Sequence, residues 1–229
     1  MRVLLIDDDE NTGCSIESML KADGIGCEIT DSGEDGLQQA GLYDYDAILL
    51  DLMLPDLSGI TLLTRLRARR IHTPVLVLSG ITGLDSKLAA LTGGADDYLT
   101  KPFDRRELVA RLRAVVRRAR GHADAKVVVG PIAIDLEKRQ VFARARPVHL
   151  TTKEFGILET LALRRNKTVS KTALLSQLYH GQDEPDPKII DVFVCKVRSK
   201  LADATDGQNM IETVWGCGYL LREPATAAA

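Results

Sequence analysis

The stretch Ala-Ile-Leu-Leu-Asp-Leu-Met-Leu-Pro-Asp at residues 47–56 constrains the fold of this chain more than any other. Four apolar residues lead directly into Asp51, and turn residues follow at Pro55 and Gly59. Such a short apolar run is typical of a strand buried in a parallel sheet, although periodicity alone does not distinguish it from a buried helix. On the strand interpretation, Asp51 lies at the carboxyl end, where open α/β sheets bind their ligands. An acid that merely caps the next helix is the structural alternative.

Three more candidate strands lead into polar residues. They are residues 3–6 before Asp7 and Asp8, 75–78 before Ser79, and 97–100 before Lys101. If the strands are parallel, one sheet edge collects carboxylates, a hydroxyl and an ammonium. Clustered carboxylates need a neutralising cation, and Mg²⁺ prefers oxygen ligands of this kind. Asp51 is then a candidate nucleophile toward phosphorus, with Mg²⁺, Lys101 and Ser79 holding the phosphoryl oxygens.

Helical periodicity alternates with these strands in the first half of the chain. Apolar residues recur at helical spacing in residues 10–22, 33–40, 60–70, 86–91 and 104–116, and a further short strand is predicted at 27–30. Strand and helix therefore alternate five times. This order predicts an α/β fold with a doubly wound (βα)5 parallel sheet.

The pattern changes in the second half. Short alternating runs predict a small antiparallel sheet over residues 127–129, 132–135, 140–143 and 147–150. A capping box at 151–154 predicts one helix, Ser170 a second, and residues 188–201 a third. Two final strands flank the glycine-containing turn 215–218, which is typical of a hairpin.

The third of these helices has a basic side. Lys188, Lys196, Arg198 and Lys200 lie outside its apolar stripe. A solvated basic helix is the ordinary explanation of such a pattern. A helix-turn-helix followed by a hairpin instead favours double-stranded DNA as partner, because one helix enters the major groove while the hairpin reaches along the backbone.

Length and charge are compatible with two domains. The 229 residues allow two ordinary cores, and the charged, small-residue stretch near 117–125 marks the boundary. Residues 127–229 hold 14 Lys and Arg against 12 Asp and Glu, so the mild excess of positive charge lies in the second half. The four cysteines form no CxxC pair, which favours free thiols in a reducing compartment. No signal peptide or membrane-length apolar run is recognised, so we expect a cytoplasmic protein that does not enter a membrane.

The first half resembles a response-regulator receiver domain, a flavodoxin-like and CheY-like fold. The resemblance rests on Asp7-Asp8, Asp51, Ser79, Tyr98 and Lys101-Pro102-Phe103, in the family's order and approximate spacing. It implies that Asp51 accepts phosphate from a histidine kinase or a histidine phosphotransferase. It also implies that Asp7, Asp8, Asp51 and the carbonyl of Met53 hold Mg²⁺, that Lys101 contacts the acceptor, and that the Lys101-Pro102 bond is cis.

The second half resembles the winged helix-turn-helix domain of the OmpR/PhoB subfamily, an α+β fold. The matching stretches are 150–155, 190–194, 196–201 and 213–219. Within the subfamily, Asp183-Glu184-Pro185, residues 188–193 and Trp215 most resemble regulators of the alphaproteobacterial cell cycle. The predicted DNA-binding residues are Lys188, Lys196, Arg198, Lys200, Thr213, Trp215 and Tyr219. Cys195, Trp215 and Cys217 stand where many relatives have basic residues, so base contacts at those positions do not carry over.

The resemblance also implies a domain plan and an output. The receiver is expected at 1–118, the linker at 119–126, the winged helix at 127–223 and a tail at 224–229. Ser79 and Tyr98 are the expected switch, and phosphorylation is expected to produce a homodimer. Its interface is predicted from the pairs Lys87 with Glu107, Asp97 with Arg111, and Asp96 with Arg113. RNA polymerase is a further candidate partner.

Other functional classes fit the sequence less well. A haloacid-dehalogenase-type phosphatase also uses an acid at a strand end, but it requires a second acid where this chain has Met53. An adaptor with an inactive receiver does not need the full acidic set. A winged helix that binds protein or RNA remains a third alternative. We therefore expect a regulator that assists its own phosphorylation and is not a turnover enzyme.

Overall fold

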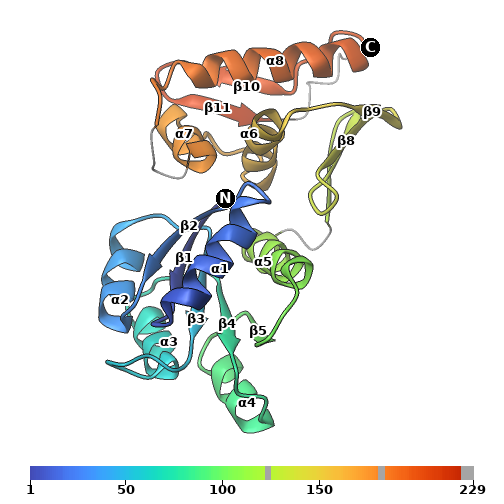
Figure 1. Cartoon of the computed structure of the whole chain (residues 1–229). Helices are drawn as coiled ribbons and strands as arrows, with labels where there is room; N and C mark the ends of the chain where they lie inside the picture. The colour runs from blue at the N-terminus through green and yellow to red at the C-terminus, as the bar shows by residue number, and fades with distance from the viewer. Residues whose placement is uncertain (122–124, 180–183, 223–229) are drawn as a thin grey trace. The chain divides into compact units, whose positions relative to one another are not determined.

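The computed structural model describes residues 1–121, 125–179 and 184–222, and the chain forms two compact units, Met1–Ala119 and Arg120–Ala229 (Figure 1). Three parts of the predicted plan lie outside the described residues. They are the middle of the linker, the loop that includes Asp183, and the end of the chain from residue 223 with the predicted tail.

The first unit is a parallel sheet with strand order β2-β1-β3-β4-β5. Its strands are β1 (Arg2–Ile6), β2 (Gly26–Thr30), β3 (Ala47–Asp51), β4 (Val75–Ser79) and β5 (Asp97–Thr100). The intervening helices are α1 (Glu10–Lys21), α2 (Gly33–Leu42), α3 (Gly59–Ala68), α4 (Leu84–Thr92) and α5 (Arg105–Ala119). The doubly wound sheet predicted from the sequence is confirmed.

Alternate residues of the strands build two separate cores. Val3 and Leu5 of β1 point to the face covered by α1 and α5, whereas Leu4 and Ile6 point to the face covered by α2, α3 and α4. Strand β3 is fully buried, as its continuous apolar sequence predicts. Because helices cover both faces of the sheet, its polar side chains become accessible to ligands at the carboxyl ends of the strands.

Among the described residues of the second unit, β6 (Lys126–Val129), β7 (Ile132–Asp135), β8 (Gln140–Ala143) and β9 (Arg146–Val148) form an antiparallel sheet. Helices α6 (Thr152–Leu163), α7 (Lys171–Tyr179) and α8 (Ile189–Ala204) follow, and β10 (Ile211–Val214) pairs with β11 (Gly218–Leu221). One core joins the sheet, the three helices and the β10–β11 hairpin. Helix α8 runs three residues beyond its predicted end, because the first left-handed residues come only at Asp206 and Gly207.

Local signals set the helix starts. Asp9 accepts a hydrogen bond from the backbone of Asn11 and begins α1. Thr151 and Glu154 form the predicted capping box of α6, with both reciprocal bonds present. Ser170 accepts from the backbone of Ala173 at 3.1 Å, as the cap predicted for α7 requires. None of the helices in the described part of the chain has the length and apolarity needed to cross a bilayer.

The two glycines of the hairpin provide a matched stability test. A Cβ on Gly218 would lie 2.1 Å from the carbonyl oxygen of Val169, while one on Gly216 meets nothing within 4 Å. Both have positive φ, +142° and +73°. We expect Gly216→Ala to cost about 1 kcal/mol and Gly218→Ala about 3 kcal/mol in urea unfolding of the second unit. Equal costs would contradict the close packing of β11 on Val169.

Candidate functional site

The ends of β1, β3 and β5 meet around the Lys101 ammonium. Its Nζ donates to Asp7 Oδ2 at 2.7 Å and to Asp51 Oδ2. Asp7 and Asp51 are only 2% and 9% exposed, so each acid needs a partner. Burial disfavours the charged ammonium, but its hydrogen bonds to Asp51 and Asp7 outweigh burial and raise the pKa of Lys101. The residues that follow three predicted strands therefore form one charged cluster.

Backbone amides fix the remaining carboxylate oxygens. Met53 N–H donates to Asp51 Oδ1, and Asp9 N–H donates to Asp7 Oδ1, both at 3.0 Å. Asp8 is exposed, as is the side chain of Met53. The Lys101-Pro102 bond is cis, as the resemblance implies.

The oxygens near Asp51 suit Mg²⁺ in type but do not form a closed cage. In the part of the chain that the structure describes, no three His, Cys, Asp or Glu side chains are grouped as a metal site. Mg²⁺ commonly binds through one or two carboxylates and completes its shell with waters and phosphate oxygens. Asp7, Asp8, Asp51 and the Met53 carbonyl fit that more open arrangement.

Ser79 and Tyr98 both contact Ile81 in the loop after β4. Ser79 is fully buried, and its Oγ accepts from Ile81 N–H at 3.2 Å. Tyr98 is 9% exposed, and its hydroxyl donates to the Ile81 carbonyl at 2.7 Å. The Lys87 ammonium lies 5.7 Å from the centre of the Tyr98 ring. Sequence reasoning missed Ile81, since its role depends on backbone atoms alone.

The residues predicted for a dimer interface make contacts within the chain. Arg111 donates to Asp97 at 3.1 Å and to Glu107 at 2.9 Å. These hydrogen bonds raise the pKa of Arg111, the bond to Glu107 most strongly. Of the three predicted pairs, Asp97–Arg111 is present as an intrachain contact.

The other predicted interface residues have different intrachain partners. Asp96 accepts from Val75 N–H at 2.8 Å and from Arg67 at 3.2 Å, and Arg113 contacts Asp23 at 3.2 Å. Arg67 and Asp23 carried no sequence signal for these contacts.

In the second unit, two basic residues of α8 bind other parts of the same unit. The Arg198 guanidinium donates to the Ile211 carbonyl at 2.7 and 2.9 Å and to Thr213 Oγ1 at 2.8 Å. Lys200 donates to the buried Glu154 at 2.6 Å. Burial raises the pKa of Glu154, but the bond from Lys200 and the capping contact with Thr151 reverse the effect and lower it.

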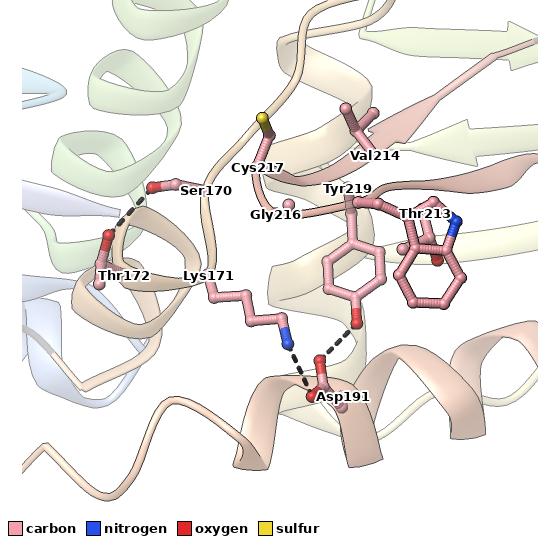
Figure 2. A pocket seen from close by; sticks show the side chains of 11 residues that line it. Ser170, Lys171, Thr172, Asp191, Thr213, Val214, Gly216, Cys217 and Tyr219 are labelled. Carbon is pink, nitrogen blue, oxygen red and sulfur yellow. Dashed lines mark hydrogen bonds and ion pairs between the residues drawn. The ribbon is translucent and has the colours of Figure 1, made fainter.

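A second network ties the hairpin to α7 and α8. The Tyr219 hydroxyl donates to Asp191 Oδ1, and Lys171 Nζ donates to Asp191 Oδ2 at 2.8 Å. Figure 2 shows both groups converging on Asp191 at the edge of a cavity of about 560 Å³. Tyr219 is 5% exposed, so it stabilises the hairpin from inside.

The predicted DNA-binding residues therefore divide into two sets. Lys188, Lys196 and Trp215 are exposed to solvent. Arg198, Lys200, Thr213 and Tyr219 are engaged in the contacts just described. The first set is exposed and makes no such contact, whereas Arg198, Lys200 and Thr213 are half-buried and Tyr219 is buried.

Family comparisons match both units. Residues 3–113 match the response regulator receiver domain, and residues 145–221 match the transcriptional regulatory protein C-terminal domain. The chain belongs to the OmpR/PhoB family of transcriptional response regulators.

Individual relatives agree with this membership. The chain is 51% identical to the cell cycle transcriptional regulator CtrA of Caulobacter vibrioides and 50% identical to the cell cycle response regulator CtrA of Brucella ovis. Each alignment covers 98% of this chain and 97% of the relative. A CheY-like receiver domain from Methanospirillum hungatei matches with 27% identity and a TM-score of 0.50, over 52% of this response regulator and 96% of that chain.

The Tyr219–Asp191 contact predicts an unusual phenol titration. Burial, followed by the hydrogen bond to Asp191, raises the pKa of Tyr219 from 10.0 to about 12. Because the folded pKa is raised, this contribution to stability is complete below pH 10.0 and is lost as the pH rises toward 12. Tyr45 is a second late phenol, because burial and its hydrogen bond to Glu28 raise its pKa even further. We expect Tyr219→Phe to remove the earlier of these two late steps from an absorbance titration of phenolate. Asp191→Asn should move that step toward lower pH, and an unchanged titration would contradict the contact.

Proposed function

We propose that phosphorylation of Asp51 controls the binding of this response regulator to promoter DNA. The observation that carries the proposal is the Lys101 ammonium held against Asp7 and the nearly buried Asp51. The phosphodonor is a histidine kinase or a histidine phosphotransferase. Similarity to the two CtrA proteins supports cell-cycle genes as targets. A regulator that binds chromosomal DNA acts in the cytoplasm.

The chemistry is an in-line transfer to a carboxylate. An Asp51 oxygen attacks phosphorus, the bond from phosphorus to the donor histidine nitrogen breaks, and an acyl phosphate forms. Mg²⁺, held by Asp7, Asp8, Asp51 and the Met53 carbonyl, would supply positive charge to the transferred group. Lys101 balances the charge of a second phosphoryl oxygen. The chain assists this transfer once per phosphorylation and does not turn over a substrate.

The signal is read through the contacts of Ile81. Phosphoryl oxygens at Asp51 are stronger acceptors for the Ser79 hydroxyl than any group it now contacts. A shift of Ser79 toward phosphate releases Ile81 N–H and disturbs the loop that Tyr98 also binds. We infer that the surface formed by α4, β5 and α5 then changes. Arg111 and Asp97 would break their contact within the chain and pair instead across the interface of a homodimer. Exposed pairs contribute about 0–1 kcal/mol each, so they set register more than affinity.

The output surface is the exposed side of α8 with the hairpin. Lys188 and Lys196 are free to approach phosphates, whereas Lys200 is held by Glu154. A receiver dimer brings a second winged helix to the second DNA half-site at high effective concentration. RNA polymerase is a further candidate partner of the protein bound at a promoter.

The phosphoacceptor is tested with two neighbouring acids. Asp51→Asn should abolish the mobility shift in phosphate-affinity electrophoresis after treatment with acetyl phosphate, and should remove the phosphodonor effect in a DNA gel shift. Asp56→Asn is the matched control, because Asp56 caps the amides of Gly33 and Glu34 and faces no phosphoryl site. A normal shift with Asp51→Asn would refute Asp51 as the acceptor.

Two lysines of α8 test the DNA-facing side. Lys196→Ala should flatten the plot of log affinity against log salt concentration by about 1, because one phosphate contact is lost. Lys200→Ala should leave that slope unchanged and instead lower the urea midpoint, since its partner Glu154 is left buried and unpaired. The reverse pattern would assign the DNA-facing role to Lys200.

A further inference from the structure

The outer strand β2 of the receiver sheet has a neighbouring strand on one side only (Figure 1). Gly26 N–H and the Thr30 carbonyl both bond inward, to the backbone at the two ends of β1. Because peptide groups alternate in direction along a strand, those of Cys27 and Ile29 point to the open side. The strand contains neither Lys nor Pro, which commonly protect a free edge. Strand β2 therefore offers backbone donors and acceptors to an added strand.

A groove with a volume of about 500 Å³ lies beside this edge, between the sheet and α2. Asp35, Gln38, Gln39 and Leu42 line it from one side of α2, because residues three and four apart share a helix face. Tyr43 follows them and completes this wall. Leu42 is 67% exposed and Tyr43 is 51% exposed. Two large side chains with this exposure at one groove are suited to contact with another molecule.

The opposite wall of the groove is held by a closed set of contacts. Arg2 donates to Glu28 Oε1 at 2.6 Å, and its guanidinium lies 5.3 and 5.0 Å from the ring centres of Tyr43 and Tyr45. The Tyr45 hydroxyl donates to Glu28 Oε2 at 2.6 Å. The wall is therefore ordered before a partner binds, and binding costs little side-chain entropy there.

The charge around the groove is negative. Residues 22–46 hold seven acids and no Lys, Arg or His. Arg2 is the cation among the lining residues, and Glu28 pairs with it. Asp35 is exposed, and among the described residues no ion pair engages its carboxylate. Helix α2 has no basic residue in its last turn, so its carboxyl end adds partial negative charge. These charges favour a basic partner.

We propose that this edge binds an extended segment of a partner protein, which adds to β2 as a further strand and carries basic side chains into the groove. Successive side chains of a strand point to opposite faces, so basic residues at every second position would reach Asp35 and lay their stems along Tyr43. The side chains between them would lie beside Ile29, which is 40% exposed on the face covered by α1. That face suits apolar residues, so the partner segment alternates basic and apolar residues.

A second copy of this chain matches the edge poorly. Symmetric pairing of β2 with β2 would set Glu28 and Asp35 of one copy near the same acids of the other, on one face of the joined sheets. The groove is also remote along the strands from the phosphoacceptor, since Arg2 begins β1 and Asp51 ends β3. Binding here needs neither phosphate nor DNA, and the inference does not rest on the proposed function.

The test measures the fluorescence anisotropy of a labelled short peptide of alternating valine and lysine with the unphosphorylated full-length protein. The peptide should bind, whereas a peptide of alternating valine and glutamate should not. Asp35→Asn should weaken binding about threefold, because one ion pair is lost. Glu34→Gln is the matched control and should leave the affinity unchanged, since Glu34 pairs with Arg65 of α3 and does not line the groove. Treatment with acetyl phosphate should also leave it unchanged.

Methylation of the peptide backbone tests strand addition without altering the protein. One version carries N-methyl groups on all its lysines, and another carries them on all its valines. Each version removes the amide donors from one edge of the extended peptide and keeps every side chain. One version should therefore lose binding while the other retains it. Equal binding by the two versions would overturn strand addition.

Other results would overturn the proposal as well. They are failure of the valine-lysine peptide to bind at millimolar concentration, equal effects of Asp35→Asn and Glu34→Gln, and affinity that changes with acetyl phosphate. A dimer of the unphosphorylated protein that the peptide dissociates in sedimentation velocity would assign the edge to a second copy. Each of these outcomes leaves the proposed function intact, because the proposed function is tested through Asp51 and DNA.

Discussion

The Lys101 ammonium is the interaction on which the receiver depends. It draws together Asp7 and Asp51, two nearly buried acids at the carboxyl ends of different strands. Lys101 lies 94 residues after Asp7 in the sequence. Without a cation between them, the acids would repel each other and lose hydration without compensation. The cluster can form only when the first and last strands are both in place. The chemistry of this edge is therefore coupled to completion of the sheet.

Much of this arrangement is predictable from the sequence, for a definite reason. The carboxyl ends of parallel strands lie at the same edge of the sheet, so an acid or lysine at the end of such a strand is placed at that edge. Asp51 and Lys101 meet because of that rule. The contacts of Ser79 and Tyr98 with Ile81 were not predictable, because the partners are a backbone amide and a carbonyl. Every residue has these groups, so composition does not indicate which of them is used.

The hydrogen-bond partners of the basic residues of α8 were equally hard to predict from the sequence. Periodicity places Arg198 and Lys200 outside the apolar stripe, and the sequence alone treats them like Lys196. The structure separates them, because Arg198 reaches the Ile211 carbonyl and Lys200 reaches Glu154. Long cationic side chains can cover apolar surface and still find a distant acceptor. The position of a residue on a helix therefore predicts the side from which its side chain leaves the helix, but not which partner its charged group contacts.

Helix α8 consequently has two polar sides with different duties. Asp191 and Arg198 are seven residues apart, which places them on one side, and both bind the hairpin. Lys188, Val192, Cys195, Lys196 and Ser199 are exposed and follow a different stripe. Substitutions in the exposed stripe change the contacts that the helix makes with its partner. Substitutions at Asp191 or Arg198 change the position of the hairpin relative to the helix. A domain built in this way can vary its DNA contacts without disturbing the geometry that aligns helix and wing.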